Sequence, residues 1–89
     1  MSDKLAGIST FMIAAEAGSF SAAGEQIHLT RAAVSNAVAR LEKRLGVRLF
    51  QRTTRSFALT EDGLLFYEHC TRALAEIESV VASFDSRRD

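Results

Sequence analysis

The last third of the sequence carries an apolar heptad pattern that limits the folds open to so short a chain. Six positions recur at steps of three and four residues, as in a coiled-coil seam: Tyr67, Cys70, Leu74, Ile77, Val81 and Phe84. Thr60 is placed to cap this segment, and a helix over residues 61–86 would be roughly 39 Å long. The rest of an 89-residue chain cannot cover such a helix. We therefore predict that residues 61–89 form a linker and dimerisation helix whose seam contacts a second copy.

Three shorter helical patterns precede that helix. Apolar spacing predicts a first helix over residues 4–17, which ends before a glycine. Ser21 is the expected cap of a short second helix that ends near His28. Thr30 is expected to cap the third helix, over about residues 30–45, which a second glycine ends.

The pattern changes from a helical to an alternating period after the third helix. Phe57 and Leu59 alternate with small residues, and an Arg- and Thr-rich link precedes them. This favours a short β-hairpin, or wing, over residues 48–58. Residues 1–60 are therefore predicted to form one mainly α domain, a winged helix-turn-helix with a three-helix core and a hairpin wing.

Charge is distributed unevenly along a chain that is neutral overall. Six acidic residues and one basic residue lie between Glu61 and Asp85. Because a polyanion responds to the local field, the basic middle of the chain suggests a nucleic-acid partner despite the zero net charge. Residues 31–55 hold seven basic side chains and one acidic one (Glu42), a local charge of +6, and the basic residues are Arg31, Arg40, Lys43, Arg44, Arg48, Arg52 and Arg55.

The third helix has a second face suited to close approach. Its members are small or hydrogen-bonding rather than long and solvating: Arg31, Ala32, Ser35, Asn36, Ala39 and Lys43. Two helices joined by a short turn, the second with such a face, can place that second helix in the major groove of DNA. Many all-helical domains also contain a corner of this kind without binding nucleic acid, and that alternative stays open.

The basic residues differ in how specifically they indicate DNA. Arg52 and Arg55 lie in the predicted wing, where a guanidinium can pair with phosphate or enter a narrow minor groove. The alternative for them is a solvated hairpin tip. For the four cations at Arg40, Lys43, Arg44 and Arg48, ordinary surface pairing with acids explains the sequence as well as phosphate contact does.

The sequence contains no recognisable catalytic or cofactor site. His69 and Cys70 are adjacent in the last helix, so their side chains point about 100° apart and cannot act as base and nucleophile. No phosphate loop, paired-carboxylate motif or metal-ligand cluster occurs. We predict a non-enzymatic protein without cofactor or metal. The sequence has a single cysteine, and we find neither a signal peptide nor a membrane-spanning segment. We therefore predict a cytoplasmic location and no membrane partner.

Four sequence blocks, in order, carry a family resemblance: residues 14–23 (AAEAGSFSAA), 29–35 (LTRAAVS), 41–53 (LEKRLGVRLFQRT) and 59–63 (LTEDG). From about residue 4 to residue 86 the chain resembles the amino-terminal DNA-binding domain of LysR-type bacterial transcriptional regulators. The resemblance implies a winged helix-turn-helix whose linker helices pair two chains on one double-stranded operator. It also implies that such dimers can pair into tetramers in a full-length parent.

The resemblance assigns DNA contacts by position. It places Ser21 at a phosphate and the start of the recognition helix in the major groove, with the wing at the minor groove or backbone. The residues expected to contact DNA are Ser21, Thr30, Arg31, Ala32, Ser35, Asn36, Arg40, Arg52, Thr53, Thr54 and Arg55. Family members favour alanine at the position of Gly24, so this glycine is expected to weaken the second helix by up to about 1 kcal/mol.

Relatives continue into a domain that senses a small effector, and none of that domain is in these residues. We therefore expect no small-molecule effector to bind this chain. The prediction is a sequence-specific, DNA-binding homodimer that regulates transcription. The rival hypothesis is a protein-interaction or dimerisation module with the same fold and no affinity for nucleic acid.

Overall fold

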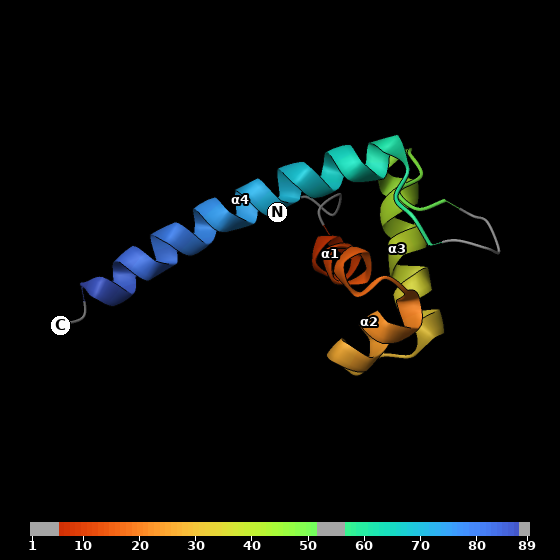
Figure 1. The fold of residues 1–89 in the computed structure, drawn as a ribbon, viewed down its shortest axis with the longest axis horizontal. Helices are drawn as coiled ribbons and strands as arrows, with labels where there is room; N and C mark the ends of the chain where they lie inside the picture. The colour runs from red at the N-terminus through yellow and green to blue at the C-terminus, as the bar shows by residue number, and fades with distance from the viewer. Residues whose placement is uncertain (1–5, 52–56, 88–89) are drawn as a thin grey trace.

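A computed structural model describes residues 6–51 and 57–87, and these residues form four α-helices. The helices are α1 (Ile8–Ala17), α2 (Phe20–Ile27), α3 (Arg31–Leu45) and α4 (Glu61–Ser86). The first three pack into a small body, and α4 extends from it as a long arm (Figure 1). The molecule measures 52 × 26 × 22 Å along its principal axes. The mainly α fold predicted from the sequence is confirmed.

Helix α1 begins later than the sequence predicted. Gly7 adopts a left-handed backbone, with φ 91°, so the helix cannot run through it and begins at Ile8 rather than at residue 4. Gly18, also left-handed, ends the helix as expected, and its N–H donates to the carbonyl of Ala14 at 3.1 Å.

The cap of α2 was predicted at the wrong serine. Ser19 has the extended backbone of a cap residue, and its hydroxyl accepts from the N–H of Ala22 at 2.9 Å. Ser21 lies inside the first turn of the helix instead. The reason is Phe20, whose buried ring fixes the first helical residue one position before Ser21. The helix ends at His28, as predicted.

The caps of the two longer helices are where the sequence placed them. Thr30 accepts from the N–H of Ala33 at 3.0 Å, and Thr60 accepts from that of Gly63 at 2.9 Å. Gly46, with φ 77°, ends α3. Helix α4 spans 26 residues and ends at Ser86, in agreement with the predicted range.

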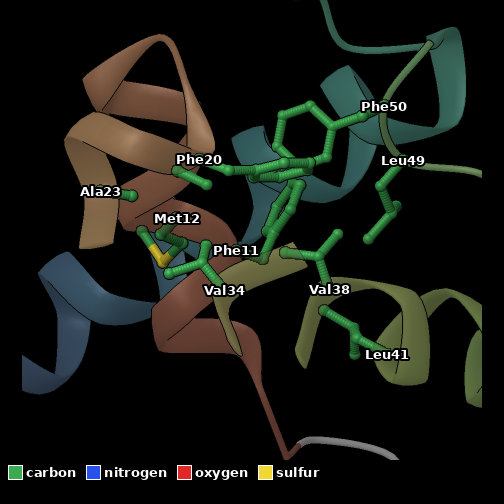
Figure 2. Packing of buried hydrophobic residues seen from close by; sticks show 10 residues of the cluster. Phe11, Met12, Phe20, Ala23, Val34, Val38, Leu41, Leu49 and Phe50 are labelled. Atoms are coloured by element: carbon green, nitrogen blue, oxygen red, sulfur yellow. The ribbon is translucent and has the colours of Figure 1, made fainter. Parts of the chain in front are cut away.

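The core of the body is built around aromatic rings. Phe11 is fully buried and lies 5.5 Å from Phe50 and 5.4 Å from Phe66, between ring centroids. Phe20 extends the cluster to Phe50 at 5.4 Å, in edge-to-face contact. Figure 2 shows Phe11 between α1 and α3, with the rings of Phe20 and Phe50 beside it. The cluster ties α1, α2 and α4 to the segment that follows α3.

The base of the predicted wing is an antiparallel pairing of two short segments. Phe50 and Leu59 form an antiparallel bridge, and the N–H of Gln51 donates to the carbonyl of Ala58 at 2.8 Å. Residues 52–56 lie outside the described part of the chain. The division of the chain at residue 60 stays a prediction.

Candidate nucleic-acid interface

The corner between α2 and α3 is tight. His28 ends α2 in a left-handed conformation, with φ 59°, and Thr30 already caps α3 two residues later. The N–H of Leu29 donates back to the carbonyl of Gly24 at 2.9 Å. Val34 and Ala23 are both fully buried in the core that the corner encloses. The geometry is therefore that of a helix-turn-helix.

Gly24 has a packing role in this corner. A Cβ built at Gly24 would lie 2.4 Å from the carbonyl oxygen of Leu29, which real Cβ contacts do not reach. Helix propensity alone predicts that this glycine weakens α2. The structure adds that α2 approaches the backbone of the turn so closely that a methyl group does not fit without a shift.

The recognition face predicted on α3 points away from the core. Val34, Val38 and Leu41 are fully buried on one side of the helix. Ser35 is half-buried at the edge of the opposite side. The exposed residues of that outer face are Arg31, Ala32, Asn36, Ala39, Arg40 and Lys43. Ala32 and Ala39 have short side chains, so a partner surface can come close to the backbone of α3 on this face.

Two cations on this face and one just after α3 form no ion pair in the described part of the chain. In the described part of the chain, Arg40, Lys43 and Arg48 are exposed and form no ion pair with a carboxylate. Surface pairing with acids, the alternative explanation for these residues, is therefore not seen among residues 6–51 and 57–87. A hollow of about 400 Å³ lies beside Lys43 and Arg48, and Glu42 also lines it.

Arg44 differs from those cations and has a structural contact. Its guanidinium is half-buried and donates to the carbonyl of Ala6, ahead of α1. The contact ties the amino end of the body to the last turn of α3. Arg44 is thus engaged by a backbone carbonyl, and not by the acidic partner that the surface-pairing alternative expects.

Glu42 is the residue that sequence reasoning missed. It is 6% exposed, and its carboxylate accepts from the backbone N–H groups of Leu49 at 2.7 Å and Phe50 at 3.2 Å. The sequence suggested a surface acid among basic neighbours. Its position one residue after the buried Leu41, on the flank of the apolar row, was the available signal for burial.

The remaining predicted DNA contacts fall into two groups. Ser21 and Thr30 are exposed on the same corner as the outer face of α3. Arg52, Thr53, Thr54 and Arg55 lie outside the described residues. Their assignments stay predictions, and so do those on the outer face of α3.

The apolar seam of α4 divides into two parts. Tyr67 and Cys70 are half-buried against the core of the same chain. The later members are open to solvent: Leu74, Ile77, Val81 and Phe84, with Val80 beside them, are 43–60% exposed. A groove of about 550 Å³ between α1 and α4, lined by residues such as Met12, Cys70 and Ile77, continues this surface onto the body. Assignment of the seam to a dimer interface stays a prediction.

The junction of α1 and α4 holds two groups with raised pKa values. The hydroxyl of Tyr67 donates to the Glu16 carboxylate at 2.8 Å, and this hydrogen bond, with some desolvation, raises the tyrosine pKa above 10.0. Burial also raises the pKa of the Cys70 thiol above 9.0. A raised thiol pKa disfavours the reactive thiolate, in keeping with a packing role for Cys70.

Residues 6–51 and 57–87 offer neither a cluster of metal ligands nor a helix able to span a membrane. No three side chains among His, Cys, Asp and Glu gather there as metal ligands could. None of the helices combines the length and apolar character needed to pass through a bilayer.

Comparisons with known proteins agree with this geometry. An HTH-type transcriptional repressor of Pseudomonas aeruginosa (strain UCBPP-PA14) is 43% identical over 81 residues, which is 91% of this chain and 26% of the relative. The HTH-type transcriptional activator AaeR of Escherichia coli K12 is 40% identical over 88% of the chain and 25% of the relative. The chain thus spans about a quarter of the length of these relatives, which are transcriptional regulators and not enzymes.

Solved structures share the arrangement of helices. The protein in the complex of the BenM DBD with benA site 1 DNA has a TM-score of 0.84, with 23% identity over 93% of each chain. The one in the CbnR DBD–DNA complex has a TM-score of 0.78, with 28% identity over 93% of this chain and 95% of that one. Residues 5–64 match the model for bacterial regulatory helix-turn-helix proteins of the lysR family. The chain therefore belongs to the lysR family of bacterial regulatory helix-turn-helix proteins.

Proposed function

We propose that this chain binds double-stranded DNA in a sequence-specific manner, as a homodimer, and thereby regulates transcription in the bacterial cytoplasm. The outer face of α3 carries the proposal. It joins small side chains to exposed cations that have no acidic partner among the described residues, on a helix held at a helix-turn-helix corner. Relatives of the same family are named transcriptional regulators, and a similar fold occurs in DNA complexes.

Residue roles follow from where each side chain lies. Arg31, Asn36 and half-buried Ser35 are suited to base edges or nearby phosphates at the start of α3. Arg40 lies farther along the same exposed face, in a position suited to contact with the phosphate backbone of DNA. The free N–H groups at the Thr30 cap can bind a phosphate oxygen. Ser21, beside this corner, and the wing residues 52–55 complete the proposed set.

The exposed part of α4 supports the dimer. Ile77, Val81 and Phe84 form an exposed apolar strip on the part of α4 beyond its contacts with the core. A second copy would cover this strip and bring a second recognition helix to the same duplex. In a full-length parent, such dimers can pair into tetramers, and effector sensing belongs to other residues than these.

The proposal is tested by selection from a random duplex library followed by a salt titration. The dimer should enrich paired half-sites whose centres lie one or more helical turns apart, about 10 base pairs per turn. On the selected duplex, log affinity should fall against log salt with a slope of about −0.9 for each phosphate contacted.

Two variants separate base reading from a general electrostatic effect. Arg31→Ala should weaken the selected duplex by at least about tenfold and reduce its preference over a scrambled duplex. Glu25→Ala, an exposed change on α2, is the matched control and should leave the preference unchanged. Enrichment of no sequence, or an affinity independent of salt, would favour the protein-interaction module instead.

A further inference from the structure

The buried carboxylate of Glu42 joins two elements that the proposed function needs together. It projects from α3, the recognition helix, and accepts from two consecutive backbone N–H groups, those of Leu49 and Phe50. These two residues open the antiparallel pairing at the base of the wing. Hydrogen bonds to an ionised acceptor are shorter and stronger than neutral ones, so one side chain fixes this segment against α3.

The opposite side of the same segment is held by the start of α4. The hydroxyl of Thr60 donates to the carbonyl of Arg48, and the N–H of Thr60 donates to the carbonyl of Leu49 at 3.0 Å. Gly63 is buried, and a Cβ built there would lie 2.0 Å from the Leu49 carbonyl oxygen. The backbone from Arg48 to Phe50 is therefore held between α3 and α4 on both its donor and its acceptor sides.

The position of Glu42 is hard to explain by the stability of α3 itself. It lies in the last turns of the helix, where the macrodipole favours cations and disfavours acids. Burial of a carboxylate is also costly unless hydrogen bonds compensate for the lost water. An apolar side chain at this position would fill the space without that cost, but it could not hold two N–H groups of the wing base.

We propose that Glu42 and Thr60 are positioning residues, a clamp that sets the wing relative to the recognition helix so that both contact one duplex at the same time. This inference rests on the proposed DNA binding. It assigns a role in affinity to two residues that are not among the proposed DNA contacts. Without the clamp, the base of the wing at Leu49 and Phe50 would lose its hydrogen bonds to α3 and α4.

A double-mutant cycle on the selected duplex tests the clamp. The first variant is Glu42→Gln, which keeps the shape of the side chain and removes its charge; the second replaces both Arg52 and Arg55 by alanine. Glu42→Gln should weaken binding to the selected duplex by about tenfold. It should also reduce the magnitude of the salt slope by about 0.9, the amount expected for one phosphate contact. In the Arg52/Arg55 background the same change should have almost no further effect. In an Arg31→Ala background its full effect should persist.

Thr60→Asp repeats the test from the other side of the wing base. Aspartate still caps α4, because its carboxylate can accept from the N–H of Gly63, but it has no hydroxyl hydrogen to donate to Arg48. Chemical denaturation reports the folded fraction of every variant at the assay temperature. We expect Thr60→Asp to weaken binding by the same factor as Glu42→Gln. It should have almost no effect when Arg52 and Arg55 are already replaced by alanine.

The outcomes separate this inference from the proposed function. If the unaltered chain selects no duplex, the proposed function fails and the clamp fails with it. If it binds DNA but Glu42→Gln and Thr60→Asp are additive with the loss of the wing arginines, only the clamp is overturned. Unfolding of the body in both variants would overturn it as well, since the two residues would then serve folding rather than positioning.

Discussion

The three-helix body and the far half of α4 use the same kinds of residue in opposite ways. In the body, Phe11, Leu41 and Leu49 are fully buried. From Thr71 to Ser86, every residue of α4 is exposed, although the apolar repeat continues without a break. A repeat of apolar positions therefore indicates that a helix face will be covered, but not whether the cover comes from the same chain.

Two phenylalanines of α4 make the contrast concrete. Phe66 lies 5.4 Å from the ring of Phe11 and belongs to the core. Phe84, five turns later, is 49% exposed and has the guanidinium of Arg87 5.5 Å from its ring. Removal of the first should affect the folding of one chain, whereas removal of the second should affect the pairing of two.

The largest expected effect comes from truncation at the centre of the body. Phe11→Ala should cost about 3–5 kcal/mol of unfolding free energy, because it removes a buried ring and leaves a cavity. That is a large fraction of the stability of a domain this small. Urea denaturation followed by circular dichroism, at a protein concentration low enough to separate dimers, measures it. Phe84→Ala is the control, and its unfolding free energy should stay within about 0.5 kcal/mol of that of the unaltered chain. A similar loss in both variants would contradict the distinction between the core and the exposed half of α4.

The next largest effect concerns the far half of α4. Ile77→Asp places a charge in the exposed strip, on a residue that is 60% exposed, and should weaken the dimer by at least about 30-fold. Sedimentation equilibrium measures the dissociation constant, and circular dichroism should show an unchanged body. Ser79→Asp, with the same charge on another face of the helix, is the control. An unchanged dimer in Ile77→Asp would place the interface elsewhere.

A smaller effect tests close packing inside the body. Gly24→Ala should destabilise the fold by about 1–3 kcal/mol, because the new methyl group meets the Leu29 carbonyl. Helix propensity alone predicts the opposite sign, a gain of about 1 kcal/mol. Denaturation midpoints decide between the two. Glu25→Ala, on the exposed side of the same helix, should change the midpoint little.

The smallest effect is expected where α4 leaves the body. The raised pKa of Tyr67 means that folding favours its neutral form, chiefly through the hydrogen bond to Glu16. This contribution is fully present below pH 10 and is lost as pH rises through the raised pKa. Tyr67→Phe should therefore lose less stability at alkaline pH than the unaltered chain. Because Tyr67 is the one tyrosine in the sequence, tyrosinate absorbance follows its titration directly.

A control for the titration is Glu16→Gln, which should bring the tyrosine pKa back toward its ordinary value. An identical alkaline loss of stability in the unaltered chain and in Tyr67→Phe would contradict the assignment. In that case the hydrogen bond would add nothing to the attachment of α4.

Local signals of the sequence were sufficient for much of the fold. Thr30, Thr60 and the glycines at 18 and 46 act through groups within a few residues, so their roles as caps and stops could be predicted. The error at α2 arose because two serines are equally able to cap. The burial of Phe20, a tertiary effect, decided in favour of Ser19.

The candidate site was predictable in outline for the same reason. The outer face of α3 follows from the helical period once Val34 and Val38 are assigned to the core. The pairing state of the cations did not follow, because it depends on which acids lie nearby in space. Arg44 reaches a carbonyl 38 residues away, and Glu42 is directed inward to the wing base.

The sequence by itself determined the order of the helices, most of their ends, the concentration of positive charge and the exposed apolar strip of α4. Each of these features depends on neighbours along the chain. Only the tertiary structure decided which apolar residues of α4 belong to the body and that Glu42 binds the wing base. It also decided that there is no room for a side chain at position 24. Those outcomes depend on distances between segments far apart in sequence, which local pattern and propensity do not encode.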